Sequence, residues 1–344
     1  MHDRLYQWIQ RVWYRGGTGY WFLLPLSAIY WLVTALRRFA YRIGLRNTEV
    51  LDVPVIVIGN LTAGGTGKTP ATLWLAQALS ERGFRPGIVS RGYGGSKSTS
   101  PMRVDGASDP AVVGDEPVLL ARRSACAVAV DRDRVRAARM LVDDGADLII
   151  ADDGLQHLRL GRDYEICVVD GQRWLGNRLL LPAGPLREPA SRLQQVDQVL
   201  VNGATREPGQ TAIEQNAIRF DLVARDVARL NGSLARPIER FAGTTVHGVA
   251  AIGNPLRFFD MLRGHGMQVI EHVFPDHAAL SVTELSFGDE FEILMTEKDA
   301  VKLGTRVGDK YWYVPVDVTM DAALAGPWLE QIDSRMRERA GSNE

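Results

Sequence analysis

The sequence contains little of what would mark a disulfide-bonded, metal-binding or nucleic-acid-binding protein. Only Cys126 and Cys167 are cysteines among its 344 residues. Each lies in an apolar run with no Cys or His at metal-ligand spacing, which favours buried thiols in a reducing cytoplasm. The formal net charge is −1, so no overall basic field would recruit nucleic acid. An anionic partner must therefore be bound locally.

Lysine is also scarce, since only five of the 40 basic residues are lysines. Hydrophobic residues make up 46% of the chain and charged residues 24%. These fractions are typical of a globular protein, and they exclude a disordered chain or a coiled coil. The length is about twice the roughly 150 residues of an average domain, so more than one unit is expected.

The first part of the chain has its own character. Residues 16–36 carry no charge, are rich in aromatic side chains and Leu, and are flanked by arginines on both sides. The run contains Pro25 and falls short of the about 20 apolar residues that span a bilayer, and no small-residue cleavage site of a secretory signal follows it. We expect residues 1–47 to form an aromatic, Arg-flanked helix that lies in or dips into a membrane surface. A buried core helix with a basic tail is the alternative.

From residue 53 onward short apolar runs alternate with amphipathic stretches, the pattern of repeated βα units in a mostly parallel sheet. Strands are expected at 54–59, 85–90, 125–130 and 146–154, with helices at 69–83 and 116–124. A long loop is expected at 91–114, and Asp131 is predicted to cap a further helix. We predict an α/β core with its sheet flanked by helices at 48–195, of the P-loop NTPase type, and a second, smaller α/β unit at 196–344.

The most specific local motif is GGTGKT at residues 64–69, between a predicted strand and a predicted helix. Backbone N–H groups of such a loop hold phosphates, Lys68 reaches the outer phosphates, and the Thr69 hydroxyl ligates Mg²⁺. The strict motif would place glycine at position 62, which here is threonine. Nucleotide contacts are expected from Thr62, Ala63, Gly64, Gly65, Thr66, Gly67, Lys68 and Thr69.

A phosphate loop needs a carboxylate on a neighbouring strand, and the run LIIADDG supplies Asp152 and Asp153. Consecutive strand residues point to opposite faces, so the two carboxylates should have different roles. One would bind the hydration shell of Mg²⁺ and the other would orient a neighbour or a ligand. A polar turn without function is the alternative.

Two further polar groups stand in loops, in VGDEP (113–117) and FPDH (274–277). Taken alone, Asp115 is more often a helix cap, and His277 is more often a surface or packing histidine. The residues by themselves leave both interpretations open.

Together the motifs resemble one family, the tetraacyldisaccharide 4'-kinases, which phosphorylate the lipid A precursor. The matching segments, in the family's order, are GNLTAGGTGKTP (59–70), SRGYGG (90–95), VGDEP (113–117), ADDGLQH (151–157), GNRLLLPAGPLREP (176–189), FPDH (274–277) and TEKD (296–299). The resemblance extends from the aromatic amino-terminal segment to the last third of the chain.

The resemblance implies transfer of the γ-phosphate of ATP to the 4'-hydroxyl of a tetraacylated glucosamine disaccharide 1-phosphate. It places the enzyme at the cytoplasmic face of the bacterial inner membrane and names no protein partner. Asp115 would accept the hydroxyl proton with His277 as its partner, while Lys68, Mg²⁺ and an aspartate at 152 or 153 stabilise the γ-phosphate. Candidates for orienting the metal, the nucleotide or the substrate are Glu116, Gln156, His157, Arg187 and Glu188.

Two other functions remain open from the sequence. The first is a membrane-associated P-loop switch ATPase that partitions or delivers cargo, although such proteins often carry Lys where this chain has Ala63. The second is a soluble kinase of a small metabolite. Because Asp115 and His277 fall in different predicted units, a hinge is expected near residues 190–200.

Overall fold

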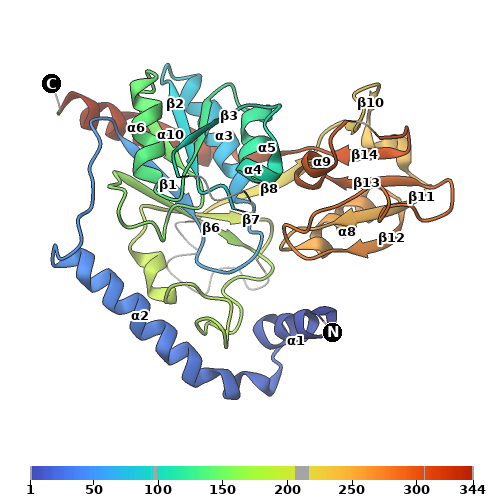
Figure 1. Cartoon of the computed structure of the whole chain (residues 1–344), viewed down its shortest axis with the longest axis horizontal. Coiled ribbons are helices and arrows are strands. Elements are labelled where there is room, and N and C mark those ends of the chain that lie inside the picture. The colour runs from blue at the N-terminus through green and yellow to red at the C-terminus, as the bar shows by residue number, and fades with distance from the viewer. Residues whose placement is uncertain (1, 94, 96–98, 206–216, 306, 343–344) are drawn as a thin grey trace.

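The computed structural model describes residues 2–93, 95, 99–205, 217–305 and 307–342. Gly94 of the SRGYGG motif lies outside these residues. The described chain forms a large sheet flanked by helices, a second sheet beside it, and two amino-terminal helices that lie apart from both sheets in the view of Figure 1. This arrangement confirms the predicted fold class.

The large sheet has nine described strands in the order β15-β8-β7-β6-β1-β5-β2-β4-β3. Their bounds are β1 (Val55–Gly59), β2 (Pro86–Ser90), β3 (Met102–Val104), β4 (Ala127–Val130), β5 (Leu148–Ala151), β6 (Tyr164–Asp170), β7 (Gln198–Asn202), β8 (Ile218–Ala224) and β15 (Val316–Met320). All neighbouring pairs are parallel except the edge pairs β3–β4 and β15–β8. The parallel strands therefore end at one edge, where ligands bind in such sheets.

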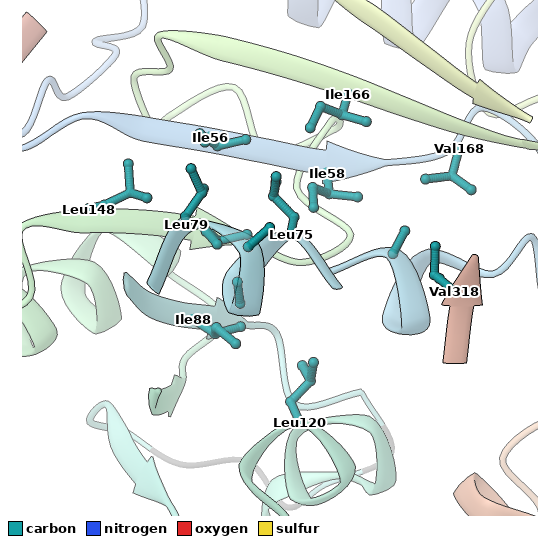
Figure 2. Close-up of a cluster of buried hydrophobic side chains, with 14 of the residues drawn as sticks. Ile56, Ile58, Leu75, Leu79, Ile88, Leu120, Leu148, Ile166, Val168 and Val318 are labelled. Atoms are coloured by element: carbon teal, nitrogen blue, oxygen red, sulfur yellow. The ribbon is translucent and has the colours of Figure 1, made fainter. Parts of the chain in front are cut away.

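Helices cover both faces of this sheet, and the strands are accordingly apolar along their whole length. Every residue of β1 and β6 is buried, as expected for parallel strands between two helical layers. Ile56 and Ile58 of β1 pack in one hydrophobic core with Leu75 and Leu79 of α3, as Figure 2 shows. The described helices of the large unit are α3 (Lys68–Ser80), α4 (Pro110–Val113), α5 (Asp115–Arg123), α6 (Arg134–Asp143), η2 (Ala190–Gln194) and α10 (Ala322–Gly341).

Two local predictions differ from the structure. The stretch expected to be one long loop at 91–114 contains β3 and α4. The cap of α6 is Asp133, whose carboxylate accepts the N–H of Val135, and not Asp131. Asp131 instead accepts the N–H of Asp133 at 2.9 Å and pairs with Arg136, so the helix is capped two residues later than predicted.

The second sheet has six described strands in the order β10-β9-β14-β13-β11-β12. They are β9 (Val227–Arg229), β10 (Ala235–Arg236), β11 (Thr245–Ala250), β12 (Gln268–Val273), β13 (Glu292–Thr296) and β14 (Tyr311–Val314). The helices of this unit are η3 (Ile238–Phe241), α8 (Pro255–Gly264) and α9 (Glu297–Leu303). Its core is separate and includes Phe241, Phe259 and Trp312.

The predicted division at residue 195 does not coincide with the boundary between the two sheets. Strands β7, β8 and β15 lie after that residue but belong to the large sheet. Trp328 of α10 also packs on the large unit, where it stacks on Trp74 and donates a hydrogen bond to Tyr164. The order of strands along the chain cannot reveal this, because the second sheet is inserted between β8 and β15.

The chain crosses between the sheets at two adjacent points. The N–H of Arg225 donates to the carbonyl of Pro315 at 2.9 Å, which holds the outgoing and returning segments side by side. A hinge between the units would therefore lie at these two segments and not at residues 190–200, which connect elements of the large unit.

The amino-terminal segment forms α1 (His2–Tyr14), η1 (Thr18–Leu23) and α2 (Leu24–Arg42). It docks on the loop before η2, where Ser27 donates to the carbonyl of Leu180 at 2.9 Å and Tyr30 to that of Arg187 at 3.0 Å. The helical stretch Thr18–Arg42 is long and apolar enough to cross a membrane by length and composition, and only 6% of its most apolar part is buried. It is therefore not a core helix.

Candidate active site

The loop between β1 and α3 has the backbone of a phosphate cradle. Gly64 and Gly67 have φ angles of 108° and 93°, in the left-handed region that other residues rarely adopt. A Cβ on Gly67 would lie 2.5 Å from the side-chain nitrogen of Asn202. Among the described residues no side chain caps α3, so the N–H groups of its first turn are free to bind an anion.

The loop residues predicted to bind nucleotide fall into two groups. Residues 64–69 line a cavity of about 870 Å³. Thr62 and Ala63 are not among its described lining residues. Instead Thr62 forms a β-bridge with Leu186, and the N–H of Ala63 donates to the carbonyl of Pro185 at 2.7 Å. These two residues hold the loop in place from behind.

The same cavity brings together groups from every part of the chain. Its described lining includes Arg37 of α2, Lys68, Glu116, Asp153, Gln156, Arg187, His277 and Lys298. The second unit forms one wall, where Gly253 packs directly against Gly65 of the loop. A ligand in this cavity would contact both sheets at once.

Asp153 follows β5 and faces the phosphate loop. One of its carboxylate oxygens lies 3.4 Å from Lys68 Nζ, and Arg187 approaches the carboxylate to 3.2 Å. Burial alone would raise its pKa, but Lys68, Arg187 and Arg134 outweigh that effect and hold the pKa well below its usual range. Asp153 is therefore a permanent anion that orients Lys68.

Asp152 has different surroundings from Asp153, although both residues lie beyond the end of β5 and Asp153 has a positive φ of 48°. It is fully buried, and one oxygen accepts a hydrogen bond from the Thr72 hydroxyl at 3.0 Å. The other oxygen has no partner among the described residues. Burial and the nearby Glu116 carboxylate raise its pKa to about 7, so a cation beside it would displace a proton at neutral pH.

The groups around the phosphate loop can supply ligands for Mg²⁺. Within the described ranges, no group of three or more His, Cys, Asp or Glu side chains is arranged around a metal. Mg²⁺ bound with nucleotide phosphates needs only one or two protein ligands. The Thr69 hydroxyl and the unpartnered buried oxygen of Asp152 fit that requirement.

Asp115 and His277 meet beside the cavity, which His277 lines, whereas Asp115 is not among its described lining residues. Asp115 is the first residue of α5 and is 5% exposed, and Nδ1 of His277 lies 3.1 Å from both of its carboxylate oxygens. Burial would raise the pKa of Asp115, but the His277 hydrogen bond and Lys298 outweigh it and lower that pKa to about 2. The structure thus joins two residues that the sequence left in separate units.

Gln156 connects the cavity to the amino-terminal helix. Its side-chain amide donates to Glu188 at 2.8 Å and to the carbonyl of Asn60 at 3.2 Å. Arg38 of α2 pairs with the same Glu188 at 3.3 Å. Burial and surrounding arginines lower the pKa of His157 to about 3, so this histidine is neutral.

Sequence reasoning missed several residues at the site. Arg134 is buried and donates to the backbone carbonyls of Asp152 and Asp153. Lys298 bonds to Glu116 at 2.8 Å, so the carboxylate predicted for the metal is held by an ammonium group. Two features of the sequence could have indicated Lys298: it lies in the TEKD motif, and lysine is a rare residue type in this chain.

A strand-loop-helix phosphate cradle that opens into a cavity lined by charged groups of both units is the arrangement expected of a protein that binds a nucleotide and transfers its phosphate. The fold and site therefore define a P-loop kinase. More specifically, the chain belongs to the family described as tetraacyldisaccharide-1-P 4'-kinase, whose model matches residues 19–334. This confirms the resemblance found in the motifs.

Individual relatives agree over nearly the whole chain. A tetraacyldisaccharide 4'-kinase of Nitrosococcus oceani is 46% identical over 332 residues, 96% of each chain. One from Alkalilimnicola ehrlichii is 50% identical over 301 residues, 88% of this chain and 89% of the relative. The crystal structure of LpxK from Aquifex aeolicus in complex with ATP matches with a TM-score of 0.73 at 26% identity, over 93% of this chain and 99% of that chain.

Proposed function

We propose that this chain transfers the γ-phosphate of ATP to the 4'-hydroxyl of tetraacyldisaccharide 1-phosphate, a step of lipid A biosynthesis. Family membership supports the reaction over a switch ATPase. The observation that carries it is the Asp115–His277 pair, whose imidazole lines the same cavity as the phosphate loop. A hydroxyl placed between the two sites would have a phosphate on one side and a proton acceptor on the other.

ATP phosphates would occupy the cradle of residues 64–69, with Lys68 at the outer phosphates. Asp153 holds Lys68 from behind, so the ammonium group keeps its position without moving when substrate binds. Thr69 and Asp152 would hold Mg²⁺, which neutralises charge on the phosphates when bound. Arg187 also reaches Asp153, and the pair lies at the edge of the cavity.

Asp115 accepts the proton of the attacking hydroxyl in this account. With a pKa of about 2 it is ionised at neutral pH, and it is a weak base. Phosphoryl transfer tolerates a weak base because the transition state is loose and needs mainly position and charge neutralisation. His277 holds the carboxylate in place and stabilises the transferred proton.

The lipid would reach the site from a membrane surface. The apolar face of η1 and α2 is exposed, with Phe22 88% and Trp21 61% exposed. Arg37 of the same helix lines the cavity and donates to the carbonyl of Gln156 at 3.2 Å. The sugar headgroup can therefore enter the cavity while its acyl chains stay in the bilayer.

We assign the cytoplasmic face of the bacterial inner membrane as the site of action. Exposed arginines that follow the apolar run, Arg42 and Arg46, would meet the anionic lipids of that leaflet, each contributing about 1 kcal/mol. ATP is also available on that side. The assignment is supported by this charge pattern and by the requirement for nucleotide.

The test is transfer of label from γ-labelled ATP to detergent-dispersed tetraacyldisaccharide 1-phosphate in the presence of Mg²⁺. Labelled lipid from the wild-type enzyme and none from Lys68→Ala supports the proposal. ATP turnover that is independent of lipid, with no labelled lipid, contradicts it and favours the switch ATPase.

A further inference from the structure

Helices α5 and α9 pack against each other at the boundary between the units. Lys298 of α9 lies in this contact. Its ammonium nitrogen lies 2.8 Å from Glu116 Oε1, 3.4 Å from Asp276 Oδ1 and 3.4 Å from Nε2 of His277. The side chain is only 15% exposed. An ammonium group so enclosed is held by several partners at once, and its position is therefore fixed.

A second lysine supports the same arrangement one turn further along α9. Lys302 lies 3.4 Å from Asp115 Oδ2 and 2.9 Å from Asp299 Oδ1. Asp299 is fully buried and also accepts the N–H of Ala251 at 2.9 Å. The second unit therefore contacts the start of α5 through two ammonium groups and the His277 ring.

The chemistry of the ammonium group restricts the imidazole. Lysine has three N–H donors and no acceptor, so in the neutral ring the Nε2 atom facing Lys298 presents its lone pair. The Nδ1 atom must then carry the hydrogen and donate it to Asp115. This fixes both the ring orientation and the tautomer, in the way that a second hydrogen-bond partner does for other functional histidines.

We propose that Lys298 is a positioning residue for phosphoryl transfer, which sets the orientation and tautomer of His277 and thereby aims Asp115 at the substrate hydroxyl. The inference rests on the proposed function, because it requires the Asp115–His277 pair to accept the proton. Lys298 belongs to the second unit and Glu116 to the large one, so the contact also makes the pair complete only when the units are together.

The structure would show the same contacts if Lys298 only neutralised the charge of Glu116. The experiment must therefore show that Lys298 acts through His277. The double-mutant cycle of Lys298→Met and His277→Ala separates the two roles. Lys298→Gln is the second neutral variant, used if the Met variant does not fold. Lys310→Met is the matched control, since Lys310 lies in the same unit and bonds to the carbonyl of Asp289.

We expect Lys298→Met to lower kcat about 100-fold, the cost of a misplacement of about 1 Å, with the KM for ATP changed less than about threefold. Lys298→Arg, which keeps a charged donor, should retain more activity than Lys298→Met. In the His277→Ala background the same Met substitution should lower kcat less than about threefold. Lys310→Met should match the wild type.

Failure of the inference and failure of the proposed function give different results. The inference is overturned, while His277→Ala remains slow, by any of three results. The losses of the two single variants multiply in the double variant, kcat is unchanged in Lys298→Met, or Lys298→Arg is no more active than Lys298→Met. Wild-type turnover in His277→Ala itself would overturn the proposed role of the pair.

Discussion

The imidazole Nδ1 of His277 lies 3.1 Å from both carboxylate oxygens of Asp115, although the two residues are 162 positions apart and belong to different units. The contact joins the first residue of α5 to a loop of the second unit. His277 adopts a positive φ of 61°, a strained conformation that is held by its surroundings and is common at functional sites. The Asp115–His277 pair therefore exists only when the two units are in contact.

The pH dependence of turnover should report on this pair. Burial would lower the pKa of His277, but the hydrogen bond to Asp115 outweighs it, and the net pKa is raised. As pH falls through this value the ring gains a proton, and its positive charge stabilises the Asp115 carboxylate. Asp115 then becomes a weaker proton acceptor. We therefore expect kcat to fall on the acid side with an apparent pKa above about 6.5.

His277→Ala removes that titrating group, so the remaining acid limb belongs to the carboxylate and should move to lower pH. The measurement is kcat from about pH 5 to about pH 9 at saturating ATP and lipid. An acid limb at the same position in His277→Ala and in the wild type would show that another group controls the rate.

Asp152→Asn and Asp153→Asn should behave differently because the two carboxylates have different partners. Asp153→Asn releases Lys68 and should mainly lower kcat and weaken ATP binding. Asp152→Asn removes the buried carboxylate assigned to the metal and should raise the Mg²⁺ concentration for half-maximal rate about tenfold or more. Titrations of Mg²⁺ at fixed ATP distinguish them, and equal, modest losses in both variants would argue against this division of roles.

Membrane binding should depend on the exposed face of η1 and α2. Replacing Phe22 and Trp31, which are 88% and 49% exposed, by Ser should lower vesicle binding about tenfold or more for each side chain, given about 1.5–3 kcal/mol of burial for a large apolar group. Leu324→Ser is the control, because Leu324 on α10 is 49% exposed, like Trp31. Co-sedimentation with anionic vesicles is the measurement, and undiminished binding of the double variant would place the membrane contact elsewhere.

Local features of the fold could be predicted from the sequence because each has a local cause. The glycines of the phosphate loop, the apolar runs of β1 and β5 and the start of α5 at a DEP motif are all set by a few adjacent residues. The large sheet could not be predicted in full, because β15 pairs with β8 across the whole second unit. Nothing near Val316 in the sequence indicates that partner.

The site, like the fold, could be predicted from the sequence only where its features have a local cause. Lys68, Thr69 and the paired aspartates follow from motif spacing, since strand and loop geometry determine their placement. The roles of Asp115 and His277 came only from resemblance to a family, because a contact between units leaves no local pattern. Arg134 and Lys298 were not assigned at all, since a buried cation is recognised by what surrounds it and not by its neighbours in the chain.

The most direct test of the account is single-turnover phosphoryl transfer by Asp115→Asn with saturating ATP, Mg²⁺ and tetraacyldisaccharide 1-phosphate. Asn keeps the shape of the side chain and removes the proton acceptor, so the rate should fall at least about 100-fold while ATP affinity stays within about threefold of the wild type. A wild-type transfer rate in Asp115→Asn would contradict the assignment of Asp115 as the group that accepts the proton.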